Sequence, residues 1–147
     1  MPRISLDANV LVYAVDSGDA RRHRAALRIV AAAAAHDCVL TLQALAEFYF
    51  VVTRKGKLSS AAARSQTEEL RNVFPIVLPG ARTLNAAMRL SDAHRIGFWD
   101  SMLIAVAREA GVEILLTEDL QDGQDFDGLR CFNPFARTAP ELSRLLR

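Results

Sequence analysis

Residues 98–117 read FWDSMLIAVAREAGVEILLT, and this stretch decides the fold class. Phe98–Ala110 is an apolar run of helical length, and it stops at Gly111, a residue type that commonly ends helices. Val112–Thr117 is short and mostly apolar, without the regular polar alternation of a half-buried strand, so it predicts a strand buried on both faces. A buried helix that leads into such a strand indicates a parallel sheet covered by helices.

The rest of the chain extends this pattern in both directions. Further short strands are predicted at Ile4–Leu6, Cys38–Leu42, Phe74–Leu78 and Leu129–Phe132. Helices are predicted at Ala20–Ala35, at Gln43–Thr53, from an N-cap at Ser59 or Ser60 to Asn72, and at Ala81–Arg95, whose inner side we assign to Leu84, Ala87, Met88 and Leu90. Gln121–Gly128 is interpreted as an acidic loop. This order predicts an α/β fold, a three-layer α/β/α sandwich with a short central, mostly parallel sheet.

Composition narrows the class of protein further. The 147 residues are 51% hydrophobic and 24% charged, with a formal net charge of +1, so we predict a single domain over residues 1–147 and exclude intrinsic disorder. No apolar run has the length of a signal peptide or a membrane span, and we expect a cytoplasmic protein with no membrane partner. Cys38 and Cys131 lie in apolar stretches and are interpreted as buried free thiols.

Four carboxylates stand in unusual surroundings. Asp7 and Asp119 each follow a predicted strand, and Asp100 begins the buried helix of residues 98–110. Glu47 is the one charged residue in a run that is apolar on every side, so we expect its side chain to be buried, which is costly for a lone carboxylate. Taken singly, each also fits a structural role as an N-cap, a turn residue or a member of an ion pair. A doubly wound sheet, however, would gather all four at one edge.

The donor chemistry of these acids indicates one class of metal. Four carboxylates in one cleft repel one another unless a cation lies among them. Oxygen donors without histidine or cysteine nearby favour Mg²⁺ or Mn²⁺ over Zn²⁺. Such ions serve phosphoryl chemistry, in which they activate a water and neutralise charge on the phosphate.

Four ordered segments resemble the PIN-domain nucleases, and their spacing is similar to that of the VapC-type toxins of bacterial toxin–antitoxin pairs. The segments are Leu6-Asp7-Ala8-Asn9-Val10-Leu11, Ala46-Glu47-Phe48, Phe98-Trp99-Asp100-Ser101-Met102-Leu103-Ile104-Ala105 and Leu116-Thr117-Glu118-Asp119-Leu120. The resemblance implies a Mg²⁺- or Mn²⁺-dependent endoribonuclease that leaves 5′-phosphate and 3′-hydroxyl ends. It assigns Asp7, Asp100 and Asp119 to the metal. It assigns Glu47 to holding a water on the metal or acting as its base.

The resemblance also implies supporting residues and partners. Asn9 would orient the first acid, and Ser101 and Thr117 would stand beside the third and fourth acids. Asp122 falls where some members carry an additional acid. The expected partners are an RNA substrate, a cognate antitoxin protein that blocks the acidic pocket, and a second copy of the chain in a homodimer.

Several surfaces are candidates for contact with those partners. The basic residues near helix ends that we expect to follow an RNA backbone are Arg21, Arg22, Arg24, Arg54, Lys55 and Lys57. We assign the antitoxin groove to Phe48, Tyr49, Val52 and Leu58. The homodimer face is assigned to Ala81–Arg95, and the Gln121–Gly128 loop is expected to influence the choice of RNA.

Three other functions stay open on the sequence. Phosphotransferases of the haloacid-dehalogenase or response-regulator kind also place an Asp after the first strand. The dehalogenase pattern, however, requires Asp and then Thr or Val where this chain has Asn9 and Leu11, and the only lysines of the chain, Lys55 and Lys57, lie in a basic helix end. A housekeeping RNA-processing nuclease and a catalytically weak RNA- or protein-binding module are compatible with the same acids. His23, His36 and His94 are scattered, which excludes a zinc-protease motif, and they are interpreted as surface or helix-end residues.

Overall fold

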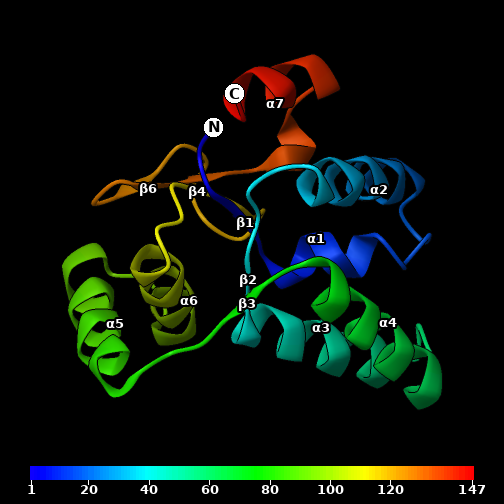
Figure 1. Cartoon of the computed structure of the whole chain (residues 1–147), viewed down its shortest axis with the longest axis horizontal. Helices are drawn as coiled ribbons and strands as arrows, with labels where there is room; N and C mark the ends of the chain where they lie inside the picture. Colours follow the sequence, from blue (N-terminus) through cyan, green and yellow to red (C-terminus); the bar gives the residue numbers. More distant parts are fainter.

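The computed structural model describes residues 1–147, and Figure 1 shows their arrangement. The strands are β1 Ile4–Leu6, β2 Leu40–Thr41, β3 Ile76–Val77, β4 Ile114–Leu116, β5 Asp125–Phe126 and β6 Leu129–Phe132. The helices are α1 Ala8–Tyr13, α2 Ala20–Ala34, α3 Leu42–Arg54, α4 Ser60–Val73, α5 Ala81–His94, α6 Phe98–Glu109, the 3₁₀ helix η1 Pro134–Ala136 and α7 Ala139–Leu145.

Four of the strands form a central, mostly parallel sheet in the order β1-β4-β6-β5. β1 and β6 both run parallel to β4, and the short β5 is antiparallel to β6. Because Leu6, Leu116 and Phe132 are partners in this register, the residues that follow these three strands emerge at one edge of the sheet. β2 and β3 form a separate parallel pair, which a bridge between Ile4 and Cys38 connects to β1.

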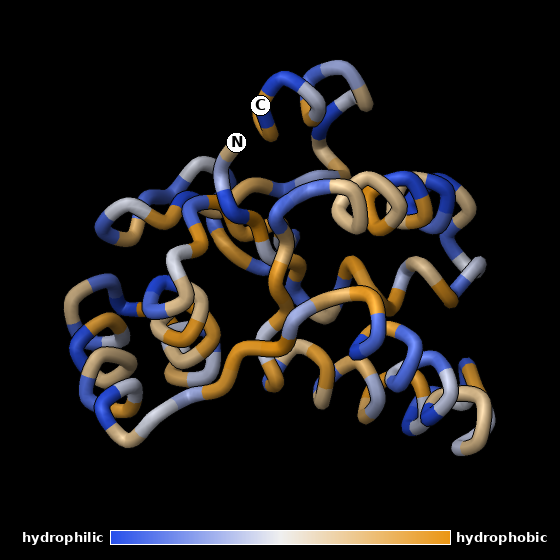
Figure 2. The backbone as a smooth tube through the Cα atoms, in the orientation of Figure 1, coloured by the Kyte–Doolittle hydropathy of each residue, from blue (hydrophilic) through white to orange (hydrophobic).

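Helices cover both faces of the sheet, which confirms the predicted α/β fold class. Ile114 and Leu116 of β4 pack in a core with α1, α2 and α3, whereas Leu115 between them packs with α5 and α6. Successive residues of a strand point to opposite faces, so β4 is apolar throughout because both of its faces are covered. Figure 1 shows α5 and α6 together, apart from α1–α4. In Figure 2 hydrophobic segments gather near the centre and hydrophilic ones lie on outer turns of the helices.

The structure confirms the longer helices and revises the short elements near the first two strands. The helix α1 was not predicted; it begins directly after Asp7, whose side chain accepts a hydrogen bond from the Ala8 N–H as the N-cap. The strand predicted at Cys38–Leu42 shrinks to β2. It ends early because Thr41 is the N-cap of α3 and its side chain accepts from the Ala44 N–H, so the chain is already helical at Leu42.

Two segments near the C-terminus also differ from the sequence analysis. The Gln121–Gly128 segment is not wholly a loop, because it contains β5, which turns back onto β6. Asp127 and Gly128 both adopt positive φ angles in that turn, of 53° and 101°. The elements η1 and α7 follow β6 and were not predicted.

The buried face of α5 differs from the predicted one. Leu84 and Met88 were assigned to the inner side, but they are 45% and 49% exposed. The buried residues of α5 are Thr83, Ala87 and Leu90, whose spacing places them on one side of the helix, which packs against α6. Thr83 tolerates burial because its hydroxyl donates to Glu109 and accepts from the Gly80 N–H.

The helix lengths and the burial of the two cysteines agree with the sequence analysis. None of the helices has the length and apolar character needed to cross a membrane. Cys38 and Cys131 are buried free thiols, as predicted, and burial raises the pKa of each to about 12. A thiol in such surroundings stays protonated and unreactive at neutral pH.

The start of α4 offers a test of local stability. Ser59 is the N-cap, and its hydroxyl accepts a hydrogen bond of 3.2 Å from the Ala62 N–H. We expect Ser59→Ala to lower the free energy of unfolding by about 1 kcal/mol, because that N–H loses its partner. Urea denaturation measures the change. Ser60→Ala is the matched control, since Ser60 is exposed and lies inside the helix, and an equal loss in both variants would contradict the assignment.

Candidate active site

Asp7 is a buried carboxylate at the carboxyl end of β1. Its side chain is only 4% exposed. The Ala8 N–H donates to Oδ1 and the Thr117 hydroxyl donates to Oδ2, each at 2.7 Å. The pKa of Asp7 is raised to about 6. Burial is the main cause, the charges of Asp119 and Glu47 also raise it, and the two hydrogen bonds lower it. The group is therefore costly to ionise in the absence of a nearby cation.

Thr117 connects Asp7 to the segment that follows β4. Because β1 and β4 are parallel neighbours, the residues after Leu6 and Leu116 lie side by side. While the Thr117 hydroxyl donates to Asp7, it accepts a bond of 3.1 Å from the Asp119 N–H and a long one of 3.4 Å from the Asn9 side-chain amide. One buried hydroxyl thus fixes three of the residues predicted for the site.

Asp119 and Asp100 extend the group of acids. Asp119 is exposed, and no hydrogen bond to its carboxylate is present. Asp100 lies in the first turn of α6 and is partly buried. Burial raises the pKa of Asp100, and the negative charge of Asp119 raises it further. The charge of Asp119 therefore acts on both Asp7 and Asp100, and the charge of Glu47 acts on Asp7.

The prediction that Glu47 is buried is wrong. Glu47 is exposed on α3, and the same helix exposes Tyr49 and 56% of Phe50. Only one face of α3 packs in the core, although its sequence is apolar all round. The Gln43 side-chain amide donates to the Glu47 carboxylate at 3.0 Å and to the Trp99 carbonyl at 2.9 Å. Gln43 thus ties Glu47 to the start of α6, next to Asp100.

A surface cleft beside α1 and α3 joins most of these groups. Its lining includes Asp7, Asn9, Glu47 and Asp119, together with Lys55, Lys57, Tyr13 and Glu118. Asp100 is outside this lining and adjoins it through Asp119. The donors are all oxygens, and the buried Asn9 Oδ1 has no hydrogen-bond partner, so the set suits a hard cation such as Mg²⁺ or Mn²⁺. No three of the acids are close enough to form a complete metal site by themselves.

A family model decides which family this arrangement belongs to. The model of the PIN domain matches residues 4–124, which is most of the chain and includes all four acids. The chain is a member of the PIN domain family. No curated protein sequence is significantly similar to it.

Solved structures share the fold of this PIN domain at low sequence identity. The toxin VapC20 of Mycobacterium tuberculosis, described as cleaving the sarcin–ricin loop, is 20% identical with a TM-score of 0.63, over 79% of this chain and 89% of that one. The VapBC2 complex of Rickettsia felis, bound to promoter DNA, is 16% identical with a TM-score of 0.64, over 88% and 96%. FitAcB of Neisseria gonorrhoeae is 19% identical with a TM-score of 0.61, over 90% and 98%.

Two residues assigned to the surroundings of the acids have other contacts in this PIN domain. Asp122 forms a salt bridge with Arg137 at 2.6 Å and accepts from the Asn133 N–H, and these contacts lower its pKa. Both of its oxygens are used in this way, and Asp122 is not among the residues that line the cleft. The buried Ser101 hydroxyl donates to the Gly97 carbonyl, which stabilises the start of α6 and not a carboxylate.

The basic residues divide into two sets. Lys55 and Lys57 line the cleft, although Lys57 also pairs with Asp16 at 3.5 Å. The others contact the protein itself or lie elsewhere on the surface: Arg21 donates to the Phe135 carbonyl, Arg22 pairs with Glu118 and Asp19, Arg54 lies over the Phe50 ring, and Arg24 is exposed. Arg21 and Arg22 therefore have contacts within the protein and lie outside the lining of the cleft.

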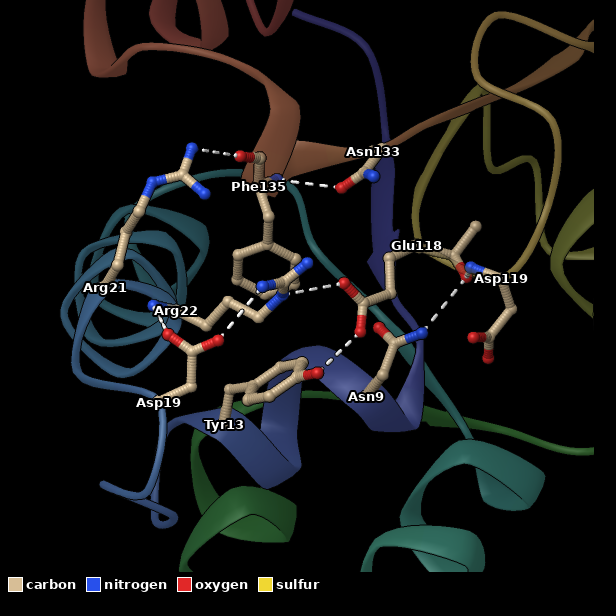
Figure 3. A network of polar contacts seen from close by, with 10 residues as sticks. Asn9, Tyr13, Asp19, Arg21, Arg22, Glu118, Asp119, Asn133 and Phe135 are labelled. Carbon is tan, nitrogen blue, oxygen red and sulfur yellow. Dashed lines mark hydrogen bonds and ion pairs between the residues drawn. The ribbon is translucent and has the colours of Figure 1, made fainter.

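Sequence reasoning missed a polar network next to the site. Figure 3 shows Glu118 directed toward Tyr13 and Arg22, whereas the Asp119 carboxylate points away from them. The pKa of Tyr13 is raised to about 12, mainly by burial and also by the hydrogen bond that its hydroxyl donates to Glu118. Arg22 and Glu118 are 96 residues apart, so no local pattern in the sequence indicated their pairing.

Proposed function

We propose that this PIN domain is a Mg²⁺- or Mn²⁺-dependent endoribonuclease whose acids are Asp7, Glu47, Asp100 and Asp119. One observation carries the proposal: a buried Asp7, costly to ionise, faces Asp119 and Glu47 in a cleft that also contains two lysines. Membership of the PIN domain family supports a nuclease, and the fold is shared with the toxin VapC20.

We assign separate roles to the four acids. Asp7, Asp100 and Asp119 would hold the cation together with bound waters, and the cation would lower the pKa of a water and neutralise charge on the phosphate. Exposed Glu47 is available to accept the proton of the attacking water, and Gln43 holds its carboxylate in place. Thr117 and Asn9 orient the acids. Lys55 and Lys57 supply positive charge for the phosphates of a bound strand.

Cleavage of cellular RNA tests this function directly. Purified protein is incubated with total RNA and Mg²⁺ or Mn²⁺, beside a lane with EDTA, and the cut ends are sequenced. We expect discrete cuts with 5′-phosphate and 3′-hydroxyl ends that disappear with EDTA. Absence of cutting with either metal would contradict the proposal and favour a binding module.

Thr117 provides a sharper prediction for the same assay. Thr117→Val removes the hydroxyl that Asp7 and the Asp119 N–H share, with little change in volume. We expect the rate of cleavage to fall by about 10- to 100-fold, as is usual when a group that orients metal ligands is lost. Thr117→Ser keeps the hydroxyl and is the matched control. Equal rates for the Val and Ser variants would show that the hydroxyl has no such role.

We further propose that the nuclease is the toxin of a toxin–antitoxin pair. One solved structure with this fold, from Klebsiella pneumoniae, is described as a toxin–antitoxin complex, and VapC20 is described as a toxin. Of the residues assigned to the antitoxin groove, Val52 is fully buried in the core and is excluded, whereas Phe48, although almost fully buried, contributes to the lining of a groove. An apolar groove does lie between α2 and α4, lined by residues that include Leu11, Leu27 and Val73, and it suits an apolar antitoxin segment.

The toxin role has its own test. The chain is expressed in a bacterial host alone and together with the protein encoded by a small neighbouring reading frame. Growth arrest that the neighbour relieves would support the toxin role, whereas harmless expression of an active nuclease would favour housekeeping RNA processing.

We also expect a homodimer, for which the exposed Leu84 and Met88 of α5 are candidate contacts.

A further inference from the structure

We propose that Arg22, with Tyr13, is a positioning residue that holds Glu118 away from the acids of the cleft and fixes the segment carrying Thr117 and Asp119. The proposal rests on the nuclease function proposed above. It assigns a role to a network that the four-acid site does not explain.

Both oxygens of the Glu118 carboxylate are occupied by this network. The Tyr13 hydroxyl donates to Oε1 at 2.7 Å, and Arg22 Nε donates to Oε2 at 3.0 Å. Glu118 belongs to the lining of the cleft and lies between Thr117 and Asp119, yet its side chain points to α1 and α2, as Figure 3 shows. Glu118 is thus a fifth carboxylate beside the site. It is paired with Arg22, and both of its oxygens already accept hydrogen bonds.

Arg22 is itself held rigidly in place. Asp19 caps α2 by accepting from the Arg22 N–H at 3.1 Å, and its second oxygen accepts from Arg22 Nη1 at 3.0 Å. The guanidinium carbon lies 5.8 Å from the ring centroids of both Tyr13 and Phe135, which contact each other edge to face at 5.1 Å. A planar guanidinium that binds two carboxylates and lies over two rings has little freedom to reorient.

The consequence of losing Arg22 follows from these contacts. Glu118 would keep one hydrogen bond but lose its counter-charge, next to a group of acids that already repel one another. It would then be free to turn into the cleft and compete for a cation, and the Thr117–Asp119 backbone would lose its anchor. Removing the charge of Glu118 should relieve much of this effect. That expectation separates a positioning role from direct RNA binding by Arg22.

The experiment compares Arg22→Met, Glu118→Gln and the double variant with the wild-type chain. Arg28→Met is the matched control, because Arg28 is exposed on the same helix, has no side-chain hydrogen bond or salt bridge, and is not among the residues assigned to RNA binding. kcat and KM are measured on an RNA oligonucleotide at saturating Mn²⁺, and circular dichroism checks folding. If Arg22→Met does not fold, Tyr13→Phe replaces it, since this change removes only the hydroxyl that binds Glu118.

We expect Arg22→Met to lower kcat by about 10- to 100-fold with little change in KM, as for other residues that orient metal ligands. Glu118→Gln added to it should restore kcat to within about 5-fold of wild type, which is a large coupling between two contacting residues. A higher KM with unchanged kcat, or additive losses in the double variant, would overturn the positioning role alone. Inactivity of both wild-type and Arg28→Met protein would instead overturn the nuclease function and this role with it.

Discussion

Replacing Asp7 with asparagine is expected to lower the rate of RNA cleavage by about 10³-fold or more, which corresponds to about 4 kcal/mol of transition-state stabilisation. Asp7 is the acid that the fold buries most completely, and both of its oxygens are fixed by hydrogen bonds. The amide keeps the size of the side chain but removes the negative charge that attracts a cation. Cleavage of a labelled RNA at saturating Mn²⁺ measures the loss.

Asp122→Asn is the control that makes this result specific. Asp122 is an acid three residues beyond Asp119, but its charge is balanced by Arg137. We expect its cleavage rate to stay within about 3-fold of wild type, because a partly exposed ion pair of this kind contributes little. If Asp7→Asn remained active, or if both variants lost activity equally, the assignment of the site to Asp7 would be wrong.

Burial of Asp7 also has a large expected effect on stability. Its pKa is raised to about 6 in the folded protein from an ordinary value of 3.8, a difference worth about 3 kcal/mol. Well below pH 3.8 the group is protonated in both the folded and the unfolded chain, and its burial does not change the free energy of unfolding. As pH rises through 4 to 6 the unfolded chain ionises first, so the free energy of unfolding falls by about 3 kcal/mol from this group.

Comparison of wild type with Asp7→Asn isolates this contribution, because the other titrating groups are shared. Without metal, the free energy of unfolding of the wild type minus that of the variant is expected to be about 2 kcal/mol lower at pH 7.5 than at pH 4. Urea denaturation in EDTA at the two pH values measures it. Addition of Mn²⁺ at pH 7.5 should stabilise the wild type more than the variant. Parallel pH profiles would show that Asp7 ionises normally in the folded chain.

The mostly parallel sheet and the places of two acids could be predicted because they depend on neighbours in the sequence. β4 is apolar in consecutive positions, and a strand of that kind is buried on both faces wherever it lies in a sheet. Asp7 and Asp119 follow strands that were recognised from such runs, so the edge at which they gather could be predicted from the parallel order. Here the hydrophobic pattern and the requirement for helices on both faces were sufficient.

The burial of Glu47 and the inner face of α5 could not be predicted in the same way. The sequence of α3 is apolar around Glu47, but the structure packs only one side of that helix and leaves Phe50 exposed. In α5, Thr83 is buried and Met88 is exposed, because the contact with α6 selects the stripe that contains Thr83. Hydrophobicity states which residues tolerate burial, whereas the position of the neighbouring helix decides which ones are buried.

The sequence by itself determined the α/β class, the family segments and the identity of the four acids, because these depend on residue type, local spacing and chain order. Only the tertiary structure decided which charges balance one another. Asp122 pairs with Arg137 and Glu118 with Arg22, over 15 and 96 residues, and these pairs remove two carboxylates from the group beside Asp7. Charges interact through space, so their partners depend on the folded arrangement of the chain and not on its local sequence.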